Sequence, residues 1–126
     1  MGILGTTAVA ALVGREELNL IRDSLAADGV EVIHAACAEE AASAPVLVIV
    51  YDADASKSWL DVLQLIRTFR PAAKVIVLSR LADNHMWVDA LSNGAYDLLS
   101  KPFYAREIRT VVRGALDALR GHAVAA

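Results

Sequence analysis

An aspartate, a serine and a lysine each stand where a predicted strand ends. Asp52 and Ser79 close two apolar runs, and Lys101 follows a third, shorter one. Because the carboxyl ends of parallel strands meet at one edge of an open α/β sheet, the three side chains are expected to converge where such sheets hold their chemistry. The sheet would fix the Asp52 carboxylate while its lone pairs face solvent and substrate, as an acceptor or nucleophile requires.

The elements that must position these residues alternate between apolar runs and helical patterns. Five strands are predicted from the apolar, often β-branched runs at residues 7–13, 30–34, 46–51, 74–78 and 97–100. Helices are predicted from the spacing of apolar residues at 15–28, 38–42, 59–70 and 83–93, and after Pro102. Gly29, Pro71 and Gly94 are predicted to end three of them. Five strand-then-helix units predict a single three-layer α/β/α domain around a doubly wound parallel sheet.

The composition bounds the class of protein. The 126 residues suffice for one domain with a normal core, and 56% hydrophobic residues are expected when strands are buried on both faces. No apolar stretch reaches the roughly 18 uninterrupted residues of a membrane span, and residues 1–5 lack the features of a signal peptide. The formal net charge of −3 argues against nucleic-acid binding by this domain. Cys37 is the only cysteine, so no internal disulfide can form, and a reducing, cytoplasmic location is expected.

The chain resembles the receiver domains of two-component response regulators over residues 6–120, which leaves 121–126 as a C-terminal tail or a truncated linker. The family's spacing is kept without a gap in three successive segments, Lys-Val-Ile-Val-Leu-Ser, Asp-Asn-His-Met-Trp-Val-Asp-Ala-Leu-Ser-Asn-Gly-Ala and Lys-Pro-Phe. The resemblance implies a CheY-like (flavodoxin-like) fold with five strands in the order 2-1-3-4-5. It also implies a cis peptide bond before Pro102.

The resemblance assigns roles to the three strand-end residues. Asp52 matches the aspartate that accepts a phosphoryl group, Ser79 the residue whose hydroxyl bonds a phosphoryl oxygen, and Lys101 the lysine that pairs with phosphoryl oxygens. Two alignments of the third strand compete. A strict alignment on the following helix puts Tyr51 at the acceptor position, whereas a one-residue deletion in the loop 53–58 puts Asp52 there. We favour Asp52 because tyrosine cannot form an acyl phosphate.

The sequence departs from the family at the metal site. Receivers normally carry an acidic pair at the end of strand one that holds Mg²⁺, but residues 10–14 read Ala-Ala-Leu-Val-Gly and no acid follows before Glu16. Mg²⁺ prefers oxygen ligands in near-octahedral geometry, so its binding is expected to be weakened. Asp52, Asp54 and Glu16 remain as candidate ligands, with Glu17 beside them. No other cofactor is predicted.

Two further positions depart from the family pattern. Arg80 replaces the small residue that normally follows the hydroxyl, and its guanidinium could pair with Asp52 as a built-in counter-ion. Arg80 and Asp54 are therefore candidate gate residues. Leu98 replaces the aromatic residue on strand five that reports the family's switch. These departures predict a degenerate, atypical receiver domain.

Two signalling mechanisms remain open for such a domain. In the first, a histidine kinase phosphorylates Asp52 and the region from helix 83–93 onward changes conformation. In the second, the domain binds a histidine kinase or another signalling protein without phosphorylation. In the family, helix 83–93, strand 97–100 and the final helix form the docking and dimer surface, so the resemblance also implies a homodimer through that surface.

An enzymatic alternative rests on the segment Val-Ile-Val-Tyr-Asp-Ala-Asp that ends at Asp54. It resembles the first motif of haloacid-dehalogenase-type phosphatases, in which the first aspartate, here Asp52, is a nucleophile and the second a general acid–base. That family needs a late acidic pair for Mg²⁺, and none follows Lys101 in the right setting. We therefore predict a signalling domain rather than an enzyme.

Overall fold

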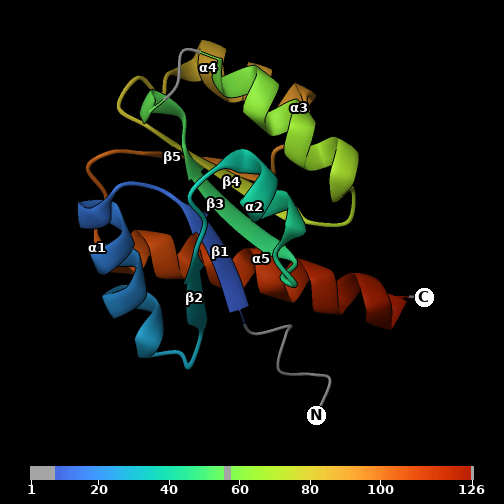
Figure 1. The fold of residues 1–126 in the computed structure, drawn as a ribbon. Helices are drawn as coiled ribbons and strands as arrows, with labels where there is room; N and C mark the ends of the chain where they lie inside the picture. The colour runs from blue at the N-terminus through green and yellow to red at the C-terminus, as the bar shows by residue number, and fades with distance from the viewer. Residues whose placement is uncertain (1–7, 56–57, 126) are drawn as a thin grey trace.

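The computed structural model describes residues 8–55 and 58–125, with side chains up to residue 120, and its centre is a sheet of five parallel strands with helices on both faces (Figure 1). The strands are β1 (Ala8–Leu12), β2 (Glu31–His34), β3 (Val48–Asp52), β4 (Lys74–Ser79) and β5 (Asp97–Ser100). The helices are α1 (Arg15–Ala26), α2 (Ala38–Ser43), α3 (Trp59–Phe69), α4 (Asn84–Ser92) and α5 (Ala105–Ala125), and a short 3-10 turn, η2 (Ala53–Ala55), follows β3. Every predicted strand and helix is present.

The strand order confirms the predicted topology. The order is β2-β1-β3-β4-β5, and every neighbouring pair is parallel. Asp52 in β3 lies opposite Leu78, and Ser79 in β4 lies opposite Ser100 in β5. This register brings the carboxyl ends of β3, β4 and β5 to the same edge, so Asp52, Ser79 and Lys101 stand there together.

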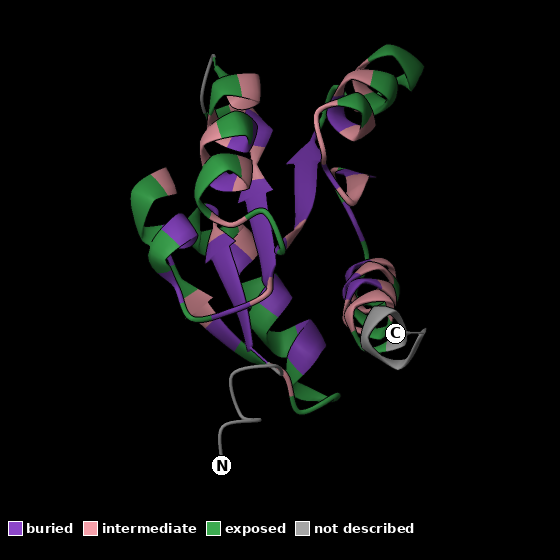
Figure 2. Cartoon of the chain, turned by 90° about the vertical axis from the view of Figure 1, so that its right-hand side faces the viewer, coloured by how far each residue is buried: buried purple, intermediate pink, exposed green. Residues whose placement is uncertain are grey.

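Alternation along the strands separates the two faces of the sheet. In β3, Val48 and Val50 belong to one core cluster, whereas Ile49 and Tyr51 belong to the other. Successive side chains of a strand point to opposite faces, which explains the division. All four are buried, and Figure 2 shows how far burial extends along the strands. Burial on both faces accounts for the continuous apolar runs in the sequence.

Two helices cover one face of the sheet and three cover the other (Figure 1). Helices α1 and α5 contribute fully buried side chains to the cluster of the β3 valines: Ile21, Leu25, Ile108 and Val112. Helices α2, α3 and α4 contribute fully buried side chains to the opposite cluster: Ala41, Leu63, Ile66 and Ala90. The helices hold the sheet rigid from both sides, which fixes the edge that carries the strand-end residues.

Glycines end α1 and α4, as predicted. Gly29 has φ of +70° and Gly94 of +97°, a region that other residues rarely adopt. After Gly29, the N–H of Val30 donates to the carbonyl of Leu25 and so satisfies one of the last helical acceptors. A Cβ at Gly94 would also lie 2.6 Å from Nε of Arg67. The turn into β5 therefore requires glycine for its backbone conformation, and any larger residue there would also displace the Arg67 side chain.

The third strand is shifted relative to its predicted span of residues 46–51. It begins at Val48 and includes Asp52. The N–H of Val46 bonds the carbonyl of Ala44, which keeps residue 46 out of the ladder although its side chain is buried. Because Asp52 is still a ladder residue, the sheet itself sets the position of its carboxylate.

The structure describes the two ends of the chain only in part. The first strand is described from Ala8 onward, and residues 6 and 7 lie outside the described residues. At the other end, α5 continues to Ala125, so the tail predicted from residue 121 is helical as far as the description reaches. Within the described ranges, no helix combines the length and the apolar character needed to cross a membrane.

Candidate functional site

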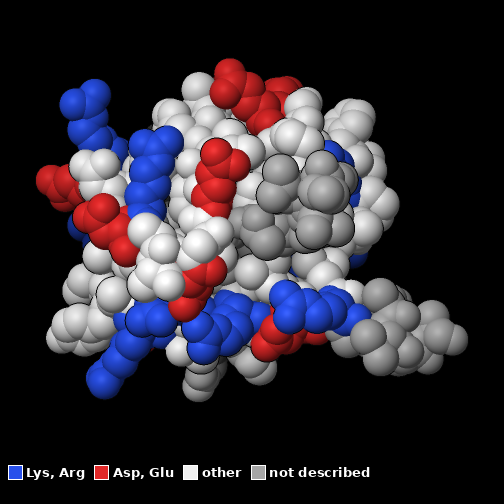
Figure 3. Space-filling model, turned by 90° about the horizontal axis from the view of Figure 1, so that it is seen from below, with Lys and Arg blue, Asp and Glu red and all other residues white. Residues whose placement is uncertain are grey.

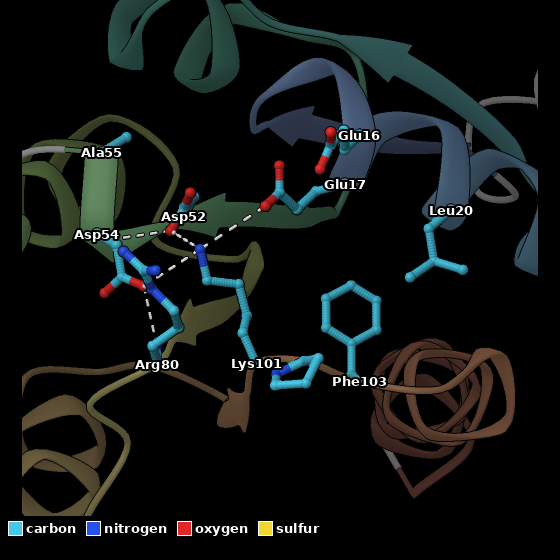
Figure 4. Close-up of a pocket in the computed structure, with 10 residues that line it drawn as sticks. Glu16, Glu17, Leu20, Asp52, Asp54, Ala55, Arg80, Lys101 and Phe103 are labelled. Carbon is cyan, nitrogen blue, oxygen red and sulfur yellow. Dashed lines mark hydrogen bonds and ion pairs between the residues drawn. The ribbon is translucent and has the colours of Figure 1, made fainter.

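Lys101 lies at the centre of an acidic cluster at the sheet edge (Figure 4). Its Nζ is 2.8 Å from Oδ1 of Asp52, 3.2 Å from Oδ2 of Asp54 and 3.8 Å from Oε2 of Glu17. The side chains of Lys101 and Asp52 are each only 10% exposed, and that of Asp54 is 15% exposed. At this level of burial the ammonium and the carboxylates depend on one another for compensation of charge.

The strand and the turn after it hold the two aspartates. Asp52 ends β3, and its Oδ1 accepts the N–H of Asp54 at 2.9 Å as well as the ammonium of Lys101. An aspartate that bonds the backbone two residues on is a common way to begin a turn, and here it begins η2. The turn brings the Asp54 carboxylate back toward the edge of the sheet.

Asp54, rather than Asp52, receives the hydroxyl of Ser79. The Ser79 hydroxyl donates to Oδ1 of Asp54 at 2.8 Å and accepts the N–H of Leu81 at 3.0 Å. The N–H of Arg80 donates to Oδ2 of Asp54 at 2.8 Å. The sequence prediction brought Ser79 to the right edge of the sheet, but the partner of its hydroxyl is the second aspartate.

The predicted pairing of Arg80 with Asp52 is corrected by the structure. Nε of Arg80 lies 3.6 Å from Oδ2 of Asp54, and the Arg80 side chain is 75% exposed. The turn η2 brings Asp54 to the end of β4, so the second aspartate, rather than the first, meets Arg80. At that exposure the ion pair is screened by water and contributes little to stability.

Burial and hydrogen-bonding or ionic partners shift the pKa values of the charged groups in opposite directions. Burial alone would raise the pKa of the Asp54 carboxyl, but the N–H of Arg80, the hydroxyl of Ser79 and the ammonium of Lys101 together hold that pKa below its ordinary value. Burial alone would lower the pKa of Lys101, but its contacts with Asp52 and Asp54 outweigh burial and raise it. Asp54 and Lys101 are therefore both charged at neutral pH.

An open pocket of about 510 Å³ lies over this cluster (Figure 4). Glu16 and Glu17 line one side of it, and Leu20 and Phe103 form an apolar wall between α1 and the start of α5. Lys101 is followed by the predicted cis peptide bond before Pro102, which the structure confirms. The pocket thus places fixed carboxylates around one buried ammonium, with a hydroxyl and a backbone N–H as further donors.

A family model decides the class of the protein. The model for the response regulator receiver domain matches residues 15–113. The chain belongs to the receiver-domain family of response regulators. Receiver domains act in two-component signalling, where they interact with histidine kinases or other signalling proteins, and they are generally signalling modules rather than enzymes.

Solved structures show the same fold. This receiver domain is similar to a response regulator from Thermotoga maritima, with 25% identity and a TM-score of 0.80 over 89% of this chain and 98% of that one. It is similar to the signal receiver domain of a putative Luxo repressor protein from Vibrio parahaemolyticus, with 20% identity and a TM-score of 0.83 over 95% and 97% of the two chains. A CheY-like receiver domain protein from Methanospirillum hungatei JF-1 has 21% identity and a TM-score of 0.80 over 93% and 98%. The comparison with curated proteins finds no match.

Tyr51 and Asp52, the two candidates for the acceptor position in β3, have different surroundings. The Tyr51 side chain in this receiver domain is buried, and its hydroxyl donates to the carbonyl of Trp59 at 2.8 Å. Burial raises the pKa of that hydroxyl, so it stays protonated. Asp52 is the residue of the two that contacts Lys101 and lines the pocket.

The end of β1 offers no acidic side chain to this receiver domain. Leu12, Val13 and Gly14 follow one another there, and Glu16 and Glu17 come only with the first turn of α1. Among residues 8–55 and 58–120, no three His, Cys, Asp or Glu side chains are grouped as metal ligands would be. Glu17 is the acid of α1 that reaches Lys101, whereas Glu16 lines the rim of the pocket.

Sequence reasoning missed one ionic contact of this receiver domain altogether. Asp28, in the turn before β2, accepts hydrogen bonds from Arg109 and Arg113 of α5. Arg109 and Arg113 stand one helical turn apart in the sequence, which by itself names no partner for them. The partner comes from the other end of the chain, and only the packing of α1 against α5 brings it close.

Proposed function

We propose that this receiver domain acts in a two-component pathway by protein contact, with Asp52 at the phosphoacceptor position and without a requirement for its phosphorylation. The observation that carries the proposal is that the ammonium of Lys101 already lies among the acids of the site. The ammonium of Lys101, within 3.8 Å of Asp52, Asp54 and Glu17, is the positive charge that these acids share.

The surroundings of Asp52 support its assignment to the acceptor position. Asp52 is itself a ladder residue of the central strand. Its carboxylate lines an open pocket and contacts Lys101, the residue that follows β5. These are the conditions that an acceptor carboxylate needs, because it must be rigid and reachable at the same time. Tyr51, the competing residue, is buried away from the pocket.

The residues present fit Mg²⁺ poorly. The ion prefers six oxygen ligands in a near-ideal octahedron, and phosphoryl transfer relies on such ions to neutralise the charge that develops. The end of β1 supplies only apolar side chains and a glycine, and Lys101 already lies among the remaining carboxylates. We therefore expect phosphorylation of Asp52 to be inefficient, and the signal to depend on binding.

The surface formed by α4, β5 and α5 is the proposed contact face. Large apolar side chains are exposed on or next to it: Leu81, Trp87, Val88 and Tyr104. Leu98, at the position of the family's aromatic switch residue, is only half-buried and packs against the cluster beneath α4. Basic side chains with acids among them run along the part of α5 that Figure 3 shows. A histidine kinase, another signalling protein or a second copy of this chain are the proposed occupants.

The phosphatase alternative gains no support from the site. A general acid must hold a proton near neutral pH, so its pKa has to be raised. The pKa of Asp54 is lowered instead, and its carboxylate is already engaged by Ser79, Arg80 and Lys101.

The test of the proposal is an intact-mass measurement of the full chain after incubation with acetyl phosphate, with and without Mg²⁺. An Asp52→Asn variant is the matched control. The expected result is no Asp52-dependent phosphoryl adduct in either condition. An adduct that requires Mg²⁺ and disappears in the variant would mean a working phosphoacceptor and would overturn the proposal. Sedimentation equilibrium of the wild type and of a Val88→Glu variant then decides whether a second copy covers the contact face.

A further inference from the structure

Three donors from different parts of the site converge on the carboxylate of Asp54. The hydroxyl of Ser79 lies 2.8 Å from its Oδ1, and the N–H of Arg80 lies 2.8 Å from its Oδ2. Nζ of Lys101 lies 3.2 Å from the same Oδ2. Figure 4 shows Asp54, Arg80 and Lys101 meeting at this point, next to Asp52.

These donors form a binding site for an anion in their own right. A hydroxyl, a backbone amide and an ammonium are the groups that bind oxyanions most strongly, and here they are supplied by the ends of β4 and β5. The hydrogen bond from the N–H of Asp54 to Asp52 explains why the chain turns after β3. It does not explain why Ser79, Arg80 and Lys101 all point at the second aspartate.

We propose that the Asp54 carboxylate is the resident anion of this pocket, occupying the donors that a phosphoryl group on Asp52 would need. The inference deepens the proposed function and rests on it, because it takes Asp52 as the acceptor position. Asp54 thereby gives the domain permanently the anion-bound arrangement that phosphorylation would otherwise have to create.

The hydroxyl of Ser79 shows how completely the donors are used. A serine hydroxyl carries a single proton, so it can donate only one hydrogen bond. Ser79 gives that bond to Asp54 and accepts the N–H of Leu81. No proton of this hydroxyl remains for a second anion. The same two bonds join Asp54 to the backbone that leads from β4 toward α4, where Leu81 is exposed on the proposed contact face.

The charges around the pocket also disfavour a second anion. Asp52, Asp54 and Glu17 face the ammonium of Lys101, and Glu16 lines the rim. The guanidinium of Arg80 is the other cation of the pocket, and it is largely exposed to water. An added phosphate would therefore meet more negative than positive charge at close range.

Removal of the Asp54 side chain should convert the pocket into a site for a free anion. The experiment compares the wild type with Asp54→Ala by nitrogen–proton NMR while inorganic phosphate is added. The amide proton of Arg80 should move upfield in the variant because its charged acceptor is gone. Phosphate should return that proton downfield in a saturable way, and the variant should bind phosphate at least about tenfold more tightly than the wild type.

Two matched controls locate the effect. Asp23→Ala removes an exposed carboxylate from α1 and should leave the Arg80 amide and the phosphate affinity as in the wild type. Ser79→Ala in the Asp54→Ala background should weaken the phosphate binding again because one donor is lost. If Asp54→Ala fails to fold by circular dichroism, Asp54→Asn serves instead, since it keeps the size of the side chain and removes the charge.

The inference is overturned if the wild type and the Asp54 variant bind phosphate equally, or if the Arg80 amide proton does not respond to the substitution. Either result is distinct from a failure of the proposed function, which would appear as a phosphoryl adduct on wild-type Asp52. If the wild type forms the adduct and the Asp54 variant binds no phosphate, the proposed function and the inference are both overturned. If the variant binds phosphate and the wild type forms no adduct, both are supported.

Discussion

Arg109 and Asp28 form a two-pronged contact although they are 81 residues apart in the sequence. Nε of Arg109 lies 3.1 Å from Oδ2 of Asp28, and its terminal nitrogen lies 3.0 Å from Oδ1. Arg113, one turn further along α5, adds a second arginine to the same oxygen at 2.8 Å. A paired, planar contact of this kind fixes orientation as well as distance. It fastens the turn after α1 to the long helix α5.

Replacing Asp28 by alanine should lower the melting temperature of the domain at low salt. The two arginines would then face each other without an acceptor, and the repulsion is strongest where salt does not screen it. Thermal unfolding followed by circular dichroism at low and high salt measures the effect, which should shrink as salt is added. Asp23→Ala is the control. Equal melting temperatures of the Asp28 variant and the wild type at low salt would contradict the prediction.

The same contact should be lost in acid. The hydrogen bond from Arg109 is the main reason that the pKa of Asp28 lies below its ordinary value. A group with a depressed folded-state pKa contributes stability above its unfolded pKa and loses it as the pH falls through the folded value. The difference in melting temperature between wild type and Asp28→Ala should therefore be present at pH 7 and vanish well below pH 3.8.

Substitution of Lys101 by methionine should destabilise the domain by about 2–3 kcal/mol at pH 7, because it leaves carboxylates at the sheet edge without their cation. The pKa of Lys101 is raised by its contacts, so this stability is present below pH 10.5 and is lost as the pH rises through the folded value. Urea unfolding at pH 7 and pH 11 measures the free energy of unfolding and its change with pH. Lys74→Met, at the start of β4, is the control. An equal loss of unfolding free energy in the two lysine variants would rule the explanation out.

Asp54→Asn should cost about 1 kcal/mol of stability at neutral pH, since it removes the charge from a carboxylate that accepts charge-assisted hydrogen bonds. The lowered pKa of Asp54 means that the contribution exists above pH 3.8 and disappears as the pH falls through the folded value. Urea unfolding of both proteins between pH 7 and pH 3 should show their difference narrowing toward acid. A difference in unfolding free energy that grows toward acid would contradict the lowered pKa of Asp54.

Tyr51→Phe should cost about 1 kcal/mol, because it removes the hydroxyl that donates to Trp59 inside the core. The pocket should be unaffected, since Tyr51 points away from it. Urea unfolding measures the loss of stability, and the chemical shift of the Arg80 amide proton shows whether the pocket has changed. A displaced Arg80 amide would show that Tyr51 belongs to the site after all.

Much of the fold could be predicted because it depends on local periodicity. The β-branched run at residues 46–51 and the glycines at 29 and 94 predicted a central strand and two helix ends, and the structure confirms all three. The bounds were less accurate, because ladder pairing rather than apolarity decides them. Val46 is as buried as a strand residue, yet its N–H bonds Ala44 and leaves it outside the sheet.

The site could be predicted only as far as the sheet determines it. Asp52, Ser79 and Lys101 meet because parallel strands end at one edge. The partner of Ser79 could not be predicted, because it depends on the direction in which η2 turns, and two aspartates with one residue between them allow either to face the serine. The spacing of Asp52 and Asp54 was the signal available in the sequence. The contact between Asp28 and α5 left no signal of this kind, because it arises from the packing of distant helices.

The short distance along the chain between Asp52 and Asp54 determines how the pocket competes for ligands. A group attached two residues from the acceptor behaves as a tethered ligand, whose effective concentration is on the order of millimolar or higher for short linkers. Dilution of the protein does not change that concentration, and a free anion has to exceed it before it displaces the carboxylate. Occupancy of the pocket in this chain is therefore set by covalent structure, and it stays constant as long as the concentrations of small anions around it remain below that value.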